Sequence, residues 1–298
     1  MNYADLAAVY LSGPATPAPV VSTTPARRLR DALEAIATQG WWAKEVHDRL
    51  APHGFGFLDA YVWGRAAGLG EPSPGVVVAT FGVFEPTFLA SVYAQGRVLL
   101  GRDAVLAERE AGAVASLRRL VEPTDAIAAA ADALMDSTGG LDGVARPLFS
   151  GLRDVPVPSD GLGRLWRGAE LVREHRGDGH LAACIAQGLD PLEMSILTER
   201  WLGYGLGEYS SSRGYGPDAI GAAVARLTTR GWMAGDDLTP AGTAMRVAIE
   251  DTTDMSQAAL VAALGDRLDA VVATATAVSD LLVAAGAVPP DGRKRAAG

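Results

Sequence analysis

The sequence predicts a mainly α-helical protein, and two features support this prediction. Apolar residues recur at helical spacing in many alanine-rich stretches of the 298-residue chain, and alanine has the highest helix propensity. The 35 glycines indicate frequent breaks, and therefore many short helices rather than a few long ones. With 49% hydrophobic residues and a mean hydropathy of +0.14, the chain can form one large hydrophobic core or two modest ones.

The N-terminal half is expected to be a flexible arm followed by a helical domain. Residues 1–26 form the expected arm, because their second half is rich in Pro, Ser, Thr and Ala. The helical domain is expected over residues 27–150, and its first helix should end before Gly40. Glycines and prolines interrupt the apolar stretch 55–96, which predicts short buried helices, although the β-branched run 76–78 also has strand propensity.

Two amphipathic helices complete this domain. They are expected at 105–122 and 123–137, and the glycine- and proline-containing stretch 139–161 is expected to connect the two halves. Residues 58–70 and 192–205 both lead from an apolar helix through arginine to a glycine break. This similarity raises the hypothesis that the N-terminal half is a degraded copy of the fold in the second half.

The second half contains clear helix-start signals. Residues 190–193 (DPLE) combine an N-cap, a proline at the first helical position and a capping-box glutamate. Gly216 precedes a helix that starts with proline, and Thr239 is expected to cap another after a hairpin with its turn at 235–237. Three helices, a hairpin and a further helix are the order of a winged helix-turn-helix domain, which is expected over 160–254.

Nucleic acid is not an expected partner of this domain. The chain has a formal net charge of −9, which repels phosphate. The helix 217–229 presents a small, slightly acidic face, and Asp236 and Asp237 lie in the turn of the hairpin. Arg226 and Arg230 do not form a basic stripe. DNA binding stays open as an alternative, because a dimer can assemble basic patches.

The C-terminal helical segment, 255–288, is more apolar than an exposed helix should be. It predicts a homodimer through this segment, with packing inside the same chain as the alternative. Residues 289–298 are expected to be a flexible tail, and this tail contains the basic cluster 293–295.

The most charged stretch, 171–180 (LVREHRGDGH), lies between two apolar helices. The preceding helix is expected to place Trp166 inward and to break at Gly177, and Asp178 should cap a new helix that runs to Gly188. In one interpretation this stretch is a helix end with favourable charges. In the other, burial connects the charged groups in a network that belongs to a ligand pocket.

The second interpretation supplies candidate catalytic residues. A histidine titrates near neutral pH and can act as a general base, with a carboxylate to orient it. The candidate catalytic residues are Glu174, His175, Asp178 and His180. The side chains of His175, Asp178 and His180 are also of types that bind metal ions, but their spacing matches no strong motif, so we expect no metal. The sequence has no phosphate-binding loop, nucleophile elbow or cysteine pair, and no cofactor is expected.

Arginines and aromatic residues supply candidate contacts to a ligand. Arg65 precedes three phenylalanines, and an arginine in such surroundings can stack on rings or bind a carboxylate. Arg173 offers a second cation for an anionic group. The candidate ligand-binding residues are Trp63, Arg65, Phe81, Phe84, Trp166, Arg173, Arg213 and Tyr215.

The remaining features concern location. The N-terminus has no basic residue before its apolar stretch, and no apolar run approaches the roughly 18 residues that span a bilayer. The single cysteine, Cys184, forms no internal disulfide. We therefore expect a cytoplasmic protein without a membrane partner. His47 and His53 are expected at a solvated helix end.

Five motifs carry a resemblance to a known family. YVWGRAAGLG, ATFGVFEP, LVREHRGDGH, SRGYG and LTPAGTAMR occur in this order and resemble the SalK-like actinobacterial winged-helix proteins, over roughly Leu29 to Pro289. The resemblance implies a mainly helical fold with a MarR-like winged helix and a small-molecule role in specialised metabolism. Arg167, Thr198 and Glu199 depart from the pattern of that family and indicate a specialised ligand.

Together these observations predict a pocket between the two halves that accepts a small anionic or aromatic molecule. The first hypothesis is a cofactor-independent acid/base enzyme. The alternatives are a ligand-binding or resistance protein without catalysis, and a MarR-type transcription regulator that responds to a ligand.

Overall fold

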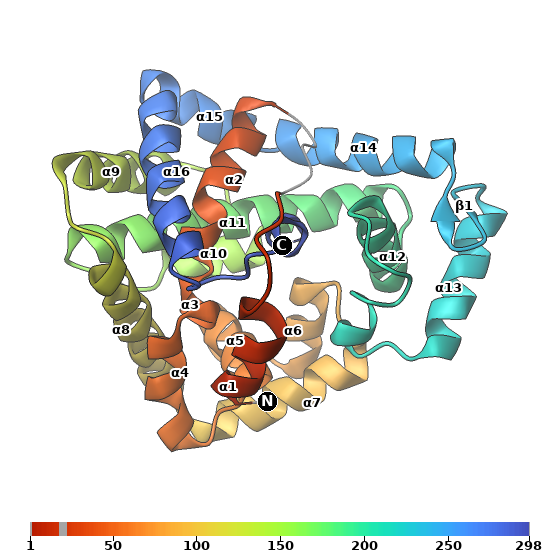
Figure 1. The fold of residues 1–298 in the computed structure, drawn as a ribbon, viewed down its shortest axis with the longest axis horizontal. Coiled ribbons are helices and arrows are strands. Elements are labelled where there is room, and N and C mark those ends of the chain that lie inside the picture. Colours follow the sequence, from red (N-terminus) through yellow and green to blue (C-terminus); the bar gives the residue numbers. More distant parts are fainter. Residues whose placement is uncertain (1, 18–22, 298) are drawn as a thin grey trace.

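The computed structural model describes residues 2–17 and 23–297 and confirms the mainly α-helical fold (Figure 1). In chain order the first half contains α1 (Tyr3–Leu6), the π-helical turn η1 (Ala7–Leu11), α2 (Pro25–Ala37), α3 (Gln39–Trp42), α4 (Lys44–Leu50), η2 (Ala51–His53), α5 (Phe57–Ala66), η3 (Ala67–Leu69), α6 (Pro74–Phe81), α7 (Pro86–Leu99), α8 (Arg102–Leu120), α9 (Asp125–Gly139) and α10 (Pro147–Arg153). The second half contains α11 (Gly161–Ala186), α12 (Pro191–Trp201), η4 (Ser211–Arg213), α13 (Pro217–Thr229), β1 (Met233–Ala234), β2 (Asp237–Leu238), α14 (Pro240–Met255), α15 (Ala258–Leu264), η5 (Gly265–Arg267), α16 (Leu268–Ala284) and α17 (Gly292–Ala296).

The first half is helical throughout its described residues. The ambiguous run 76–78 lies in α6, whose proline start favours a helix over a strand. Helix α2 ends at Ala37, and Gly40 lies inside α3 rather than after the end of a helix. A Cβ at Gly40 would lie 2.6 Å from Nη2 of Arg109, so close packing explains this glycine. The described part of this half has no β-hairpin, and the proposed winged-helix copy therefore lacks a wing.

The helix-turn-helix part follows the predicted order. Asp190 and Glu193 form the predicted capping box of α12, and Thr239 caps α14 through the backbone N–H of Gly242. The wing is short, because β1 and β2 pair antiparallel over only two residues each. Ile220 and Leu227 of α13 are buried in the core of this domain, as predicted from their helical spacing.

Helix α11 belongs to both hydrophobic cores. Its N-terminal part, up to Val172, packs in the large core of the first half, and Ala183 and Cys184 pack in the helix-turn-helix core. The division between the cores therefore falls inside one helix, and not in the stretch 139–161 that was expected to connect two domains. That stretch contains α10, which packs against α11. Figure 1 shows α11 crossing the middle of the molecule, with α12, α13 and α14 at one side.

The C-terminal helix α16 packs against α2 and α9 of the same chain. Val271, Ala275, Val278 and Leu282 are buried in the large core. The apolar character of the segment is therefore explained by packing within the chain, which was the alternative to a homodimer. A dimer stays a prediction.

Both terminal segments are packed where the structure describes them, although they were expected to be flexible. Leu6 is fully buried. Thr16 pairs with Asp291 in an isolated parallel bridge, and its backbone N–H donates to the carbonyl of Pro290 at 3.2 Å. Asp291 also caps α17. Composition does not reveal this pairing between the two ends; positions 18–22 of the expected arm lie outside the described residues.

Candidate functional site

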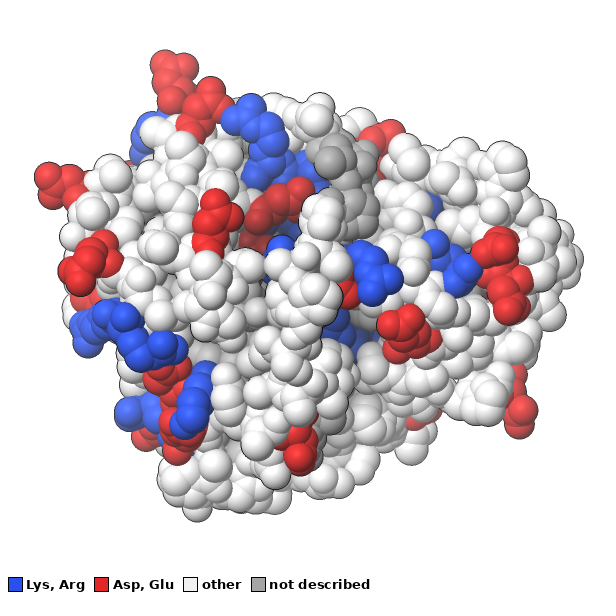
Figure 2. Space-filling model, in the orientation of Figure 1, with Lys and Arg blue, Asp and Glu red and all other residues white. Residues whose placement is uncertain are grey.

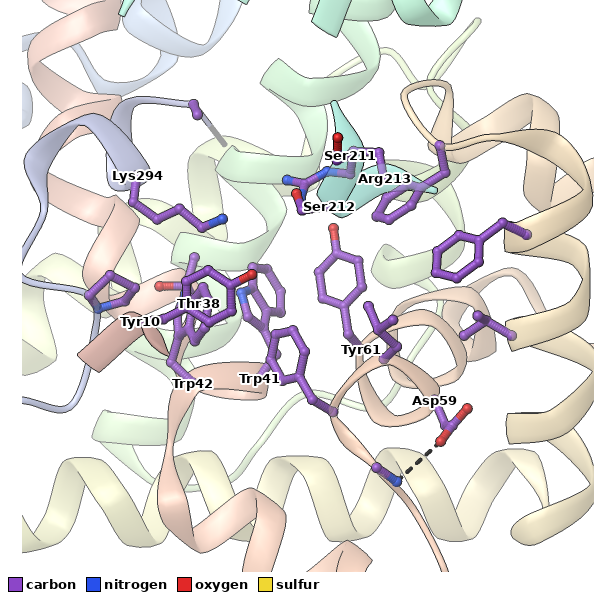
Figure 3. A pocket seen from close by; sticks show the side chains of 18 of the residues that line it. Tyr10, Thr38, Trp41, Trp42, Asp59, Tyr61, Ser211, Ser212, Arg213 and Lys294 are labelled. Carbon is purple, nitrogen blue, oxygen red and sulfur yellow. Dashed lines mark hydrogen bonds between the residues drawn. The ribbon is translucent and has the colours of Figure 1, made fainter. Parts of the chain in front are cut away.

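A cavity of about 590 Å³ lies where the N-terminal helices, the segment before α13 and the C-terminal segment meet (Figure 3). Its volume lies within the range of small-molecule sites. It is lined by Tyr10, Glu34, Thr38, Trp41, Trp42, Gly56, Phe57, Leu58, Asp59, Tyr61, Phe84, Phe88, Ser91, Val92, Gln95, Arg173, Ser211, Ser212, Arg213, Pro289, Lys294, Arg295 and Ala297. Segments from both ends and from the middle of the chain thus form one site.

Aromatic rings make up much of the wall. Trp42 and Phe57 are stacked with their ring centroids 5.3 Å apart, and Trp41 meets Tyr61 edge to face at 5.4 Å. The Tyr61 hydroxyl accepts a hydrogen bond from Arg65 at 2.7 Å, which fixes the ring from behind. Such an array offers flat apolar surfaces to a planar ligand.

Four cationic side chains reach the same cavity. Arg173 is paired with Glu34, with Nε 3.4 Å from the carboxylate, and its guanidinium lies 4.9 Å from the centre of the Trp41 ring. The guanidinium of Arg213 lies 4.1 Å from the centre of the Tyr209 ring. Lys294 and Arg295 come from α17. The wall therefore combines rings with positive charge.

Three of the predicted ligand-binding residues line this cavity: Phe84, Arg173 and Arg213. Arg65 lies one layer behind it and makes two hydrogen bonds to Glu174, at 2.9 and 2.7 Å. Its guanidinium is 4.7 Å from the centre of the Phe81 ring. Arg65 thus both stacks on rings and binds a carboxylate, as its surroundings predict, but the carboxylate belongs to the protein.

The other predicted ligand contacts lie in the cores. Trp63 is buried and donates its indole N–H to the carbonyl of Leu100 at 2.8 Å. Trp166 is fully buried, and the guanidinium of Arg109 lies 5.3 Å from its ring centre. Tyr215 packs against the helix-turn-helix core. Sequence spacing identified these aromatic side chains but not the direction in which they point.

The charged stretch 171–180 does not break at Gly177. Helix α11 continues to Ala186, and Asp178 does not cap a helix. The buried Asp178 carboxylate instead accepts a hydrogen bond from the backbone N–H of Phe149 at 3.0 Å. Burial raises the pKa of Asp178 to about 7 although this hydrogen bond opposes the shift. The helix is continuous because partners on α2, α5, α10 and α14 satisfy its buried charges.

Glu250 of α14 binds three buried arginine side chains. Its carboxylate accepts hydrogen bonds from Arg27 at 2.9 Å, from Arg176 at 2.8 Å and from Arg246 at 2.6 Å. Burial opposes the ionisation of Glu250, but the three guanidinium groups outweigh it and lower its pKa. The charged side chains of the stretch are thus buried or half-buried and paired, and their partners come from α2, α5, α10 and α14; that they belong to a ligand pocket stays a prediction.

Both histidines of the stretch are held away from the cavity. His175 Nδ1 lies 2.8 Å from Oε1 of Gln257, and His180 Nδ1 lies 3.0 Å from the hydroxyl of Thr253. Burial lowers the pKa of His175 to about 4. Burial and the charge of Arg246 lower the pKa of His180 to about 3. Both imidazoles are therefore neutral near pH 7.

His47 is not solvated, although it was predicted at a solvated helix end. His47 is buried, its Nε2 lies 2.9 Å from the carbonyl of Trp41, and its ring stacks on Phe57. The prediction of a solvated position failed because the aromatic partners come from other segments.

Among residues 2–17 and 23–297, no group of three or more His, Cys, Asp or Glu side chains could hold a metal ion. No helix of the described chain is long and apolar enough to cross a membrane.

The arginines of α13 point back to their own domain. Arg226 Nε donates to Glu193 at 2.9 Å, and Arg226 is also paired with Asp190. Arg230 donates to the carbonyl of Gly188 at 3.0 Å. On the face shown in Figure 2, the surface over α13 and the wing is mainly uncharged and carries no cluster of Lys and Arg side chains.

Several cavity residues were not predicted. Lys294 and Arg295 were identified as a basic cluster but assigned to a flexible tail, and Trp41 and Trp42 were not among the candidate ligand-binding residues. Glu199 is fully buried and accepts hydrogen bonds from three backbone N–H groups in the segment 207–210. It thereby holds the segment that carries Arg213.

The fold and the cavity define a helix-turn-helix protein with a cavity lined by aromatic side chains. The family model described as a helix-turn-helix family matches residues 26–289. The chain therefore belongs to this helix-turn-helix family. Neither the curated proteins nor the solved structures include a match to the chain.

Proposed function

We propose that this protein binds a small organic molecule in the cavity and carries out no reaction of its own on it. The observation that carries the proposal is the cavity of about 590 Å³ with seven aromatic side chains in its wall. Apolar and aromatic walls with a few placed polar groups are typical of small-molecule sites. The resemblance to SalK-like proteins, which implies a small-molecule role, agrees with this proposal.

The proposal differs from the acid/base enzyme of the first hypothesis. The cavity wall includes none of the four candidate catalytic residues. The imidazoles of His175 and His180 are hydrogen-bonded to Gln257 and Thr253 on the α14 side of α11. A general base must reach the proton that it removes, and these two do not reach the cavity in this arrangement.

The test uses Nile red, a neutral aromatic dye whose fluorescence rises in apolar surroundings. Ser91→Trp places a bulky ring at the cavity wall, and Ala129→Trp adds the same ring at an exposed position of α9 as the matched control. We expect the wild type and the control to bind the dye and the blocked variant to bind at least about tenfold more weakly. Equal binding by all three proteins would contradict the proposal.

Native mass spectrometry of the freshly purified protein identifies what the cavity holds. A small organic mass that is present in the wild type and lost in Ser91→Trp is the expected result. The same mass retained by Ser91→Trp would place the bound molecule elsewhere in the protein.

A second candidate function, ligand-responsive DNA binding, is favoured by the match to the helix-turn-helix family. Ser211, Ser212 and Arg213 line the cavity directly before α13, so a ligand would contact the segment that positions this helix. DNA binding at low salt, where phosphate contacts are strongest, tests it. Because Arg226 and Arg230 are engaged within the domain, we rank this function second.

A further inference from the structure

The positive charge of the cavity is not balanced within it. Glu34 is paired with Arg30 and Arg173, and the carboxylate of Asp59 accepts a hydrogen bond from the backbone N–H of Gly56 at 3.1 Å. These are the two acidic residues of the wall. Both carboxylates are thus engaged with neighbours of their own.

Three cationic side chains of the cavity have no carboxylate partner among the described residues. Within the described chain, no carboxylate lies within ion-pair distance of Arg213, Lys294 or Arg295. Arg213 donates to the hydroxyl of Ser212 at 2.8 Å, and its Nε is buried without a hydrogen-bond partner among the described residues. These three residues are half-buried; partial burial of a cation without a counter-charge is unfavourable, and an incoming anion would relieve this cost.

Two of these cations, Arg213 and Lys294, approach the cavity from different segments. Figure 3 shows Lys294 and Arg213 extending toward the space above Trp41 and Tyr61 from opposite sides. The Nζ of Lys294 lies 4.6 Å from the centre of the Tyr10 ring. The site therefore has a positive end, formed by η4 and α17, and an aromatic end.

We propose that Arg213 and Lys294 form a clamp for the anionic group of a planar aromatic acid, whose ring system stacks on the aromatic wall below them. This inference rests on the proposed ligand-binding function and specifies its ligand class. Arginine supplies a planar, always charged fork, and lysine supplies a single ammonium donor. A carboxylate or a sulfonate between them would meet hydrogen-bond donors from two sides.

Lys294 also makes the clamp sensitive to pH. Burial and the charge of Arg213 lower the pKa of Lys294 to about 7, although Asp291 and Glu208 oppose the shift. The rings of Tyr10 and Tyr209 also face this side chain. An anion beside the ammonium stabilises the protonated form, so binding raises this pKa and takes up a proton.

The sign of the pH dependence follows. Below about pH 7 the ammonium is already protonated, and the affinity for an anion is highest. Above about pH 7 protonation must accompany binding, so the affinity should fall by up to about tenfold per pH unit. A neutral aromatic ligand should show no such fall.

The experiment compares two dyes on the full chain. Anilinonaphthalene sulfonate is an aromatic anion, and Nile red is neutral. We expect Arg213→Met and Lys294→Met each to weaken sulfonate binding at least about tenfold, with Nile red binding within about twofold of the wild type. Lys44→Met, which removes an exposed lysine outside the cavity, is the matched control and should change neither affinity.

Lys294→Arg separates charge from titration. It should keep the affinity for the sulfonate within a few-fold but lose its pH dependence, because arginine does not titrate in this range. If Arg213→Met does not fold, the two Lys294 variants suffice, since α17 is a short terminal helix outside the large core.

The outcomes are distinguishable. Sulfonate binding that neither substitution weakens, with Nile red still bound, would overturn the clamp and leave the proposed function standing. Absence of binding of either dye to the wild type would overturn both. Selective loss of the sulfonate, together with the pH dependence of the wild type, supports the clamp.

Discussion

Removal of Arg65 or Glu174 tests whether these two residues support the site from behind or act inside it. Their side chains are 10% and 6% exposed, and two hydrogen bonds of 2.9 and 2.7 Å join them. Burial opposes the ionisation of Glu174, but the charge and hydrogen bonds of Arg65 outweigh it and lower its pKa. Arg65→Met therefore leaves a buried carboxylate whose nearest remaining cation, Arg173, is 3.9 Å away.

The magnitude follows from these contacts. A hydrogen bond between charged groups contributes about 1.5–3 kcal/mol, and breaking one side of a buried ion pair costs about 3–5 kcal/mol. The stacking of Arg65 on Phe81 and Tyr61, at 4.7 and 5.2 Å, adds about 1 kcal/mol. We expect each of Arg65→Met and Glu174→Gln to lower the free energy of unfolding by about 4 kcal/mol.

The assay is urea denaturation followed by circular dichroism on the two single variants and on Arg65→Met/Glu174→Gln. Because the double variant buries no unpaired charge, it should lose no more stability than either single variant; with about 4 kcal/mol lost by each single variant, this corresponds to a coupling of at least about 4 kcal/mol. The exposed pair Lys44 and Asp48 serves as the control cycle and should couple by less than about 1 kcal/mol. Additive losses for Arg65 and Glu174 would refute the reasoning, and so would a folded Arg65→Met protein that no longer binds Nile red.

Three further predictions concern stability. The pKa of Asp178 in the folded protein, about 7, lies above its ordinary value of 3.8, so the stabilisation from its protonated form is fully present below about pH 4 and is lost as the pH rises through 7. In urea denaturation, the free energy of unfolding of Asp178→Asn relative to the wild type should rise by up to about 4 kcal/mol between these pH values, and a difference that does not change with pH would count against the prediction. A Cβ at Gly112 would lie 2.6 Å from the backbone of Val46, whereas Gly221 in α13 has open space around it. Gly112→Ala should therefore lower the melting temperature, and Gly221→Ala should stabilise the protein by about 1 kcal/mol; equal effects of the two substitutions would contradict the prediction. Glu250→Gln leaves three buried guanidinium groups without their common carboxylate and should cost about 3–5 kcal/mol, which a protein of unchanged stability would disprove.

Local signals predicted much of the fold. The capping box at Asp190 and Glu193 and the cap at Thr239 act within a few residues, so the sequence alone contains the information that starts α12 and α14. The break predicted at Gly177 failed because it was inferred from the repulsion of Glu174 and Asp178 on one helix. Arg65 and Phe149 relieve that repulsion from distant segments.

The cavity was harder to predict, because its wall is built from segments that are far apart in the sequence. Phe84, Arg173 and Arg213 were chosen for their residue type and neighbourhood, and these three line it. Lys294 was assigned to a flexible tail because a short basic segment has no local feature that fixes it. Its position depends on the pairing of Asp291 with Thr16, two residues far apart in the sequence.

The buried charge network and the cavity are connected through the packing of α11. The Glu250 carboxylate binds arginines of α2, α11 and α14, and thereby ties the last helix of the helix-turn-helix domain to the N-terminal helices. Arg173, on another face of α11, reaches the cavity beside Trp41. Buried ion pairs contribute little net stability but penalise alternative arrangements in which a charge is left unpaired. We therefore infer that the stretch 171–180 sets the position of the domain that brings Arg213 to the cavity, and that its charged residues act on the cavity through this position.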